Sequence, residues 1–148
     1  MYRKHHNGQL TIEEFYVPFG GTLDSDNRWV MFSSLMPWEE LEEAYASQFS
    51  PTTGAPAKPV RLAFGALFIK QRLGLTDKET VEQIRENAYM QFFLGFAGYS
   101  SKAPLDSSMN LLPKAVRPWC SKLWRHSQTT TLMIQMPVQR IRFHLMTS

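Results

Sequence analysis

Apolar residues dominate one long stretch in the middle of the chain and recur there at helical spacing. Over residues 60–73, "VRLAFGALFIKQRL", they fall nearly all round a helix, which predicts a mostly buried helix that ends at Gly74. Thr76 and Glu79 have the spacing of a capping box, so a second helix is predicted over 77–87. Helix, glycine turn and helix together form the outline of a helix-turn-helix unit, although most such pairs only pack against each other.

The same spacing predicts the core. The second helix keeps a narrow apolar stripe at Val81, Ile84 and Ala88. The following run, "YMQFFLGF", is expected to place Tyr89, Phe92, Phe93 and Phe96 in the middle of the core. The residues expected to be buried together are Phe64, Leu67, Phe68, Val81, Ile84, Phe92 and Phe93.

An earlier helix is predicted over 37–49, because Pro37 suits the first helical position and Glu39 complements the helix dipole. We interpret the glutamates of "EELEE" as a solvated helix start and not as a metal or acid–base site. Before this helix, residues 1–36 are rich in turn residues and predict one short extended piece at 14–17. The paired glycines that follow it are interpreted as a plain turn and not as a phosphate cradle.

Composition is that of a globular protein. The chain has 148 residues, with 43% apolar and 20% charged residues, which is enough for one domain. One cysteine excludes a disulfide framework and suggests a reducing compartment. We find neither a signal peptide nor an apolar run that spans a membrane, so the sequence predicts a soluble, cytoplasmic protein without membrane contact.

Charge is distributed unevenly along the chain. The formal net charge is +3, but residues 1–106 hold 10 Lys+Arg and 13 Asp+Glu, a net of 10 − 13 = −3. Residues 107–148 hold 6 Lys+Arg and no acid, a net of +6. The basic excess therefore belongs to the C-terminal segment, and an argument for DNA binding needs a local basic patch.

Candidate DNA contacts come from the first helix of the pair. The second helix has four acids and only two bases, so phosphates would repel it. Arg61 and Arg72 share a face of the first helix, with Lys58 near it, and these three are the candidate DNA-binding residues. The alternative is that they form a rim of long side chains around a buried helix. No metal ligands are expected, because the histidines and Cys120 lack the spacing of zinc ligands. We also expect no catalytic residue and no cofactor.

The run "NRWVMFSSLMPWEELEEAYASQF…AKPVRLAFGALFIKQRLGLTDKETVEQIRENAYMQFFLGF" resembles a known family. It is similar to the N-terminal (InsH-like) domain of bacterial insertion-sequence transposases of the insertion-sequence-five type. The resemblance covers about residues 10–109, and Pro37-Trp38, Lys58-Pro59 and Leu73-Gly74 are among its most specific pieces. It implies a helical leader domain that helps to bind the terminal inverted repeats. In the family this domain precedes an RNase H-like domain whose Asp, Asp and Glu hold two divalent metals.

The C-terminal segment departs from that family. There a "DSSM"-like stretch precedes a basic helix that reads roughly Phe-Arg-Lys-Arg-Phe-Gly-Pro, whereas here "DSSM" precedes "NLLPKAVRPW". If the codons are read one base later, the junctions from Leu112 to Trp119 permit each of those family residues in turn. Residues 110–148 are therefore interpreted as a frameshifted tail that begins after Met109 and is expected to be disordered or poorly packed.

The sequence thus predicts a mostly α-helical domain over 10–105, an anomalous basic tail over 110–148 and no catalytic domain. The function that the resemblance implies is DNA transposition through the terminal inverted repeats, with weak DNA binding and no strand transfer by this chain itself. Two alternatives stay open. One is a stand-alone DNA-binding regulator, and the other is a protein–protein module that binds intact transposase and interferes with it.

Overall fold

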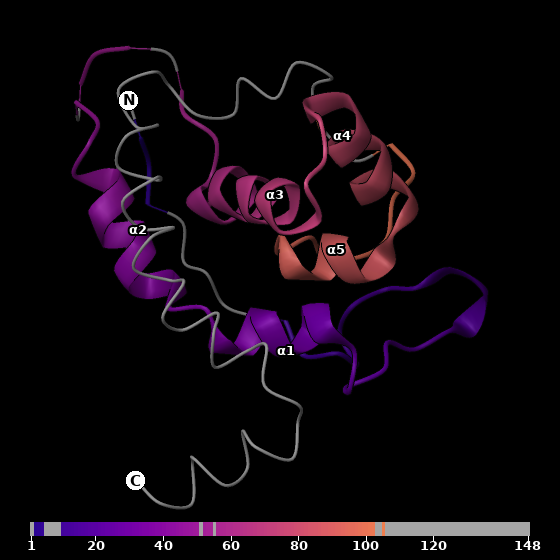
Figure 1. The fold of residues 1–148 in the computed structure, drawn as a ribbon. Coiled ribbons are helices and arrows are strands. Elements are labelled where there is room, and N and C mark those ends of the chain that lie inside the picture. Colours follow the sequence, from indigo (N-terminus) through magenta and orange to yellow (C-terminus); the bar gives the residue numbers. More distant parts are fainter. Residues whose placement is uncertain (1, 5–9, 51, 55, 103–104, 106–148) are drawn as a thin grey trace, which may run out of the picture. The chain divides into compact units, whose positions relative to one another are not determined.

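The computed structural model describes residues 2–4, 10–50, 52–54, 56–102 and 105. These residues all belong to the first of two compact units, which spans 1–113; the second unit, 114–148, lies outside the described part. The described part is mostly α-helical, as predicted, and Figure 1 shows the arrangement of its helices. Its elements are the short 3-10 turn η1 (Pro18–Gly20) and the helices α1 (Arg28–Leu35), α2 (Trp38–Ala46), α3 (Val60–Leu73), α4 (Asp77–Glu86) and α5 (Ala88–Phe93).

Helix α3 has the predicted bounds. Gly74 ends it in the left-handed conformation, with φ of 64°, which a glycine adopts without a steric penalty. The amides of Gly74 and Leu75 both donate to the carbonyl of Lys70. The capping box is also confirmed, because the Thr76 hydroxyl accepts from the Glu79 amide and the Glu79 carboxylate accepts from the Thr76 amide. The Glu79 carboxylate accepts from the Thr76 amide and from the Thr76 hydroxyl, and these two bonds lower its pKa.

The boundary between α4 and α5 lies at Asn87. Its side-chain oxygen accepts from the amides of Tyr89 (2.9 Å) and Met90 (3.2 Å), so it begins α5 directly after α4 ends. Gln91 is completely buried, and its amide group donates to the carbonyl of Ile84 at the end of α4. The same side chain exchanges hydrogen bonds with the backbone of Ser100, which holds the following loop against the helix pair.

Helix α1 lies in the region where the sequence predicted only turns and one extended piece. Asn27 caps the helix by accepting from the amide of Trp29, and α1 packs against α5. Apolar residues occupy most positions of this short helix without a repeating stripe, and its aromatic residues have modest helix propensity. The helix therefore forms because packing buries it and not because of its local pattern.

Phe93 occupies the middle of the core, as predicted. It is completely buried, and its ring lies 5.4–5.6 Å from the rings of Trp29, Trp38 and Phe68, which come from α1, α2 and α3. The other residues predicted to be buried are so, with one exception: Leu67 is only partly buried. Two aromatic residues placed in the middle of the core, Tyr89 and Phe96, are also partly exposed.

A second cluster holds the segment before α1. Phe15 and Leu23 are buried against Val30 of α1 and Phe92 of α5. Tyr16 forms an isolated parallel bridge with Gly98, which is the only β pairing among the described residues. The extended piece predicted at 14–17 is thus a single bridge and not a strand.

The predicted α2 is shorter than expected, because Pro37 is its N-cap and the helix ends at Ala46. One of its glutamates contradicts the solvated interpretation of the "EELEE" cluster. Glu42 is buried and accepts a 2.6 Å hydrogen bond from the Tyr2 hydroxyl, which in turn accepts from the Val60 amide. Burial, followed by this bond to Glu42, raises the pKa of Tyr2 above its ordinary value. The beginning of the chain therefore joins α2 to the start of α3.

Candidate nucleic-acid interface

The two arginines predicted as DNA contacts do share one face of α3. They are eleven residues apart, which at about 100° per residue returns to the same side of the helix. That face, however, is turned toward α1. The guanidinium of Arg61 donates to the Ser33 hydroxyl (2.8 Å), and that of Arg72 lies 5.1 Å from the centre of the Phe32 ring.

Arg61 is buried, with an exposed fraction of 4%. Its Nε donates to the carbonyl of Phe93 (2.9 Å) and its Nη2 to the carbonyl of Phe92 (3.2 Å). These carbonyls lie at the C-terminal end of α5, where the helix dipole favours a positive charge. The group also lies 5.0 Å from the centre of the Trp38 ring. Arg61 thus connects α1, α2, α3 and α5.

Space for this guanidinium depends on Gly95. A Cβ atom at Gly95 would lie 2.8 Å from the Cδ and 2.9 Å from the Nε of Arg61, and the residue has φ of +83°. Burial lowers the pKa of Arg61 to about 10, so the group still carries its charge at neutral pH. A phosphate contact requires an accessible guanidinium, and that of Arg61 is buried. Arg61 therefore does not belong to the predicted basic patch.

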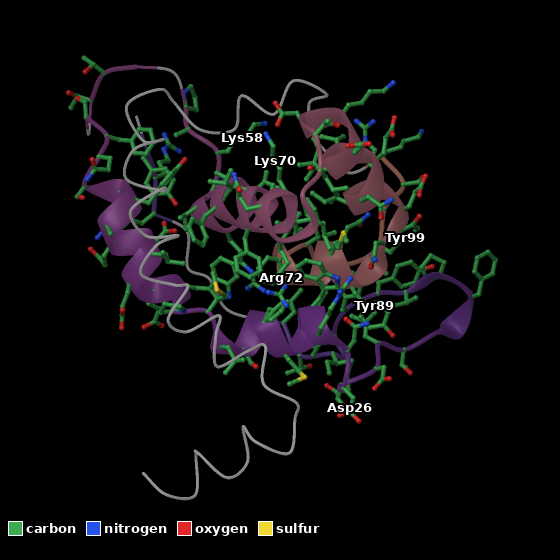
Figure 2. All side chains as sticks on the ribbon, in the orientation of Figure 1. Asp26, Lys58, Lys70, Arg72, Tyr89 and Tyr99 are labelled. Atoms are coloured by element: carbon green, nitrogen blue, oxygen red, sulfur yellow. The ribbon has the colours of Figure 1, made fainter. Side chains whose placement is uncertain are left out.

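Lys58 is exposed in the loop before α3 and is separate from the arginine face. Figure 2 shows Lys58 and Lys70 on one side of α3 and Arg72 on the other. Lys70 forms an ion pair with Asp77 of α4. The three predicted residues therefore do not form one surface, because Lys58 is exposed, Arg72 is partly buried on α1 and Arg61 is internal. Whether Lys58 or Arg72 contacts DNA stays a prediction.

The outer surface of α4 is acidic, as its sequence indicated. The two bases of this helix have partners: Lys78 lies 3.9 Å from Glu82, and Arg85 donates to the carbonyl of Leu105 (2.7 Å). A recognition helix needs free donors and a favourable charge toward the phosphates of the major groove. Packing between α3 and α4 is therefore the role that the geometry supports for this helix pair.

A shallow cavity of about 320 Å³ lies at the junction of α1 and α2, with Ser33, Trp38, Glu39 and Glu40 among its lining residues. In the described part of the chain, no group of three or more His, Cys, Asp or Glu side chains is placed to hold a metal ion. None of the helices described here has both the length and the apolar character of a membrane span.

The sequence matches a family described as "Transposase domain (DUF772)" over residues 18–112. This match covers more than half of the chain and every helix from α1 to α5. The chain belongs to this transposase domain family. The predicted resemblance to a transposase domain is thereby confirmed.

One curated relative of this transposase domain is "Uncharacterized protein ORF8 in nfe locus" from Rhizobium meliloti. The two sequences are 34% identical over 94 residues, which is 64% of this chain and 42% of the relative. The chain thus matches less than half of the relative's length. No solved structure matches this transposase domain.

Sequence reasoning missed the residues that fix the geometry of the transposase domain. Ser33 and Trp38 hold Arg61 in place, yet both lie far from it in the sequence. One signal was available in the sequence. Arg61 lies in the first turn of a nearly all-apolar helix, and such a position is compatible with a buried guanidinium as much as with an exposed one. The carbonyl acceptors at the end of α5 carry no sequence signature, so their role required the structure.

Proposed function

We propose that this transposase domain acts in DNA transposition, as the N-terminal helical part of an insertion-sequence transposase. The observation that carries the proposal is the family match over residues 18–112. Its DNA partner is the pair of terminal inverted repeats that the family resemblance implies. Transposition takes place on bacterial DNA, so the proposal also places the chain in the cytoplasm.

DNA binding by this chain is proposed to be weak. Among the described bases, Arg61 is buried, Lys4 and Lys70 have carboxylate partners, and Arg85 binds a backbone carbonyl. These four bases are engaged within the domain, and residues 1–106 carry a net charge of −3, so we expect the helical domain to attract phosphates only weakly. Residues 107–148, which hold six Lys+Arg and no acid, lie outside the described residues and are proposed to supply most of the attraction to DNA.

The chain is also proposed not to catalyse strand transfer. Two-metal phosphoryl transfer requires carboxylates that converge on metal ions about 3.5–4 Å apart. The sequence has no Asp or Glu after Asp106, and most of the earlier acids belong to helices whose role in packing is described above. The proposed frameshift after Met109 accounts for the missing carboxylates.

A second candidate function is association with an intact transposase, which the fragment would inhibit. The net charge of −3 over residues 1–106 favours it, because an acidic surface is better suited to a basic protein than to DNA. The stand-alone regulator is the remaining alternative and requires specific binding to the inverted repeats by the helical domain.

Co-expression tests the proposed role in transposition. A marked insertion element is mobilised by an intact transposase that carries this domain, with and without the full chain. We expect the chain to lower the transposition frequency, whereas a chain that carries the destabilising substitution Phe93→Ala should lower it less. A wild-type chain that has no effect on transposition of such an element would contradict the proposal.

A further inference from the structure

The loop over residues 11–26 exposes two aromatic side chains. Tyr16 is 67% exposed, and Phe19, at the η1 turn, is fully exposed. In Figure 1 this loop is the indigo segment that extends away from the helices before α1. We call it the aromatic loop. Tyrosine and phenylalanine are both enriched at the centre of protein–protein interfaces, and tyrosine is among the residue types that most often dominate the affinity.

The aromatic loop is anchored on both sides of its exposed tip. Phe15 precedes the tip and Leu23 follows it, and both are buried in the second cluster. The amide of Tyr16 donates to the Ala97 carbonyl (3.3 Å), and the Tyr16 carbonyl accepts from the Tyr99 amide (2.8 Å). Because these contacts fix the backbone before any partner arrives, little conformational entropy is lost when the tip binds.

Further along, the Asp24 amide donates to the Tyr89 hydroxyl (3.1 Å), which holds the second half of the aromatic loop against α5. Tyr89 and Tyr99 are both packed against the second cluster, and Figure 2 shows them on the side of α5 toward the loop. The residues at both ends of the loop are therefore packed against the domain, while its tip is exposed to solvent.

Phe19 has an unusual backbone for its residue type. Its φ of 64° and ψ of 23° lie in the left-handed region, which asparagine and glycine adopt far more readily than phenylalanine. The fully exposed ring gains no compensating burial within the described part of the domain. A strained and solvent-exposed phenylalanine is therefore unfavourable for folding alone and favours a role in binding.

The charges of the aromatic loop select the kind of partner. Glu13, Glu14, Asp24 and Asp26 lie within residues 11–26, and no Lys or Arg does. Such a loop repels phosphates, so it does not suit DNA, and two copies of it would repel each other. A basic protein surface with an apolar pocket complements both its charge and its exposed rings.

We propose that the aromatic loop docks onto the basic, DNA-handling surface of an intact transposase, with the Phe19 ring in an apolar pocket and Tyr16 beside it. This inference rests on the proposed function, since a protein that handles transposon ends must present positive charge to the phosphates. It assigns the interfering activity to a defined surface: the loop competes for the cations that would otherwise contact DNA.

The test is direct binding between the full chain and a purified intact transposase that carries this domain, measured by biolayer interferometry. Phe19→Asn removes the ring and suits the left-handed backbone, so the fold is retained; a thermal melt verifies this. We expect Phe19→Asn to weaken binding roughly tenfold or more, as truncation of a central interface aromatic does. The matched control is Leu35→Gln, which removes another exposed apolar side chain, on α1, and should leave the affinity unchanged.

A second variant tests the charge. Glu13→Gln with Asp26→Asn removes two negative charges and keeps the turn bonds, which Glu14 and Asp24 accept from the Thr11 and Asp26 amides. We expect weaker binding to the transposase and a smaller loss of affinity between 50 and 200 mM salt, the range over which such electrostatic contacts weaken. Prebinding the transposase to its inverted-repeat DNA should block the wild-type chain.

The outcomes separate this inference from the proposed function. Wild-type affinity in Phe19→Asn, or an equal loss in Leu35→Gln, would overturn the docking surface. A loss of DNA binding or of self-association in Phe19→Asn, with transposase binding intact, would assign the loop to DNA or to a second copy and would overturn it as well. If the chain lowers transposition without binding transposase, only this inference fails; if it does neither, both proposals fail.

Discussion

The α3–α4 pair and the aromatic loop differ in how their sequence patterns relate to what they present to solvent. The pair has the outline of a DNA-binding motif, yet Arg61 donates to the carbonyls of Phe92 and Phe93 inside the domain, and the bases of α4 have partners. The sequence of the loop predicts turns, yet Tyr16 and Phe19 are exposed within it, and the same segment contains four acidic residues. Charge and residue type therefore predict function only once the direction of each side chain is known.

The largest expected effect is on stability and concerns Phe93, which is buried in the core, whereas Phe19 of the aromatic loop is fully exposed. Phe93→Ala removes the ring that contacts aromatic rings from three helices, so we expect it to lower the free energy of unfolding by ~3–5 kcal/mol. Urea unfolding followed by circular dichroism measures this change. A loss below about 1 kcal/mol would show that Phe93 is not the centre of the core.

Arg61→Ala is expected to have the next largest effect. It removes the guanidinium donor from the buried carbonyls of Phe92 and Phe93, of which Phe92 keeps a bond from the Gly95 amide, and it removes the packed side-chain stem. Together these losses should cost roughly 2–4 kcal/mol. Lys58→Ala, in the exposed loop before α3, is the control and should change stability by less than about 0.5 kcal/mol. If instead Arg61→Ala is as stable as the wild type, the guanidinium does not stabilise the fold, and Arg61 is again a candidate for DNA contact.

The smallest effect has the opposite sign. Phe19→Asn relieves the left-handed backbone and removes a ring that makes no buried contact, so we expect the free energy of unfolding to rise by about 0.5–1 kcal/mol. Differential scanning calorimetry detects such a change as a higher Tm. A destabilised variant would mean that the ring has a packing role in the free domain, and the comparison between the two regions would lose its basis.

Much of the fold could be predicted because the signals are local. The bounds of α3, the left-handed Gly74 and the capping box of Thr76 each follow from a few neighbouring residues. Helix α1 could not be predicted, because its eight residues carry no repeating stripe and are stabilised by α5. For the candidate site, the shared face of Arg61 and Arg72 followed from helix geometry. Its direction did not, because that depends on Ser33 and Phe32 of a helix that the sequence did not reveal.

The most direct test of the account is DNA binding by the full chain, measured by fluorescence anisotropy on an inverted-repeat duplex and a scrambled duplex at several salt concentrations. The comparison is a chain in which the six Lys and Arg of residues 107–148 are replaced by Gln. We predict equal, weak binding to both duplexes, with a Kd of ~10⁻⁴–10⁻⁶ M that weakens steeply with salt and is lost in the Gln variant. Specific, salt-resistant binding to the inverted repeat that persists in the Gln variant would contradict the account. It would show that the helical domain itself reads DNA.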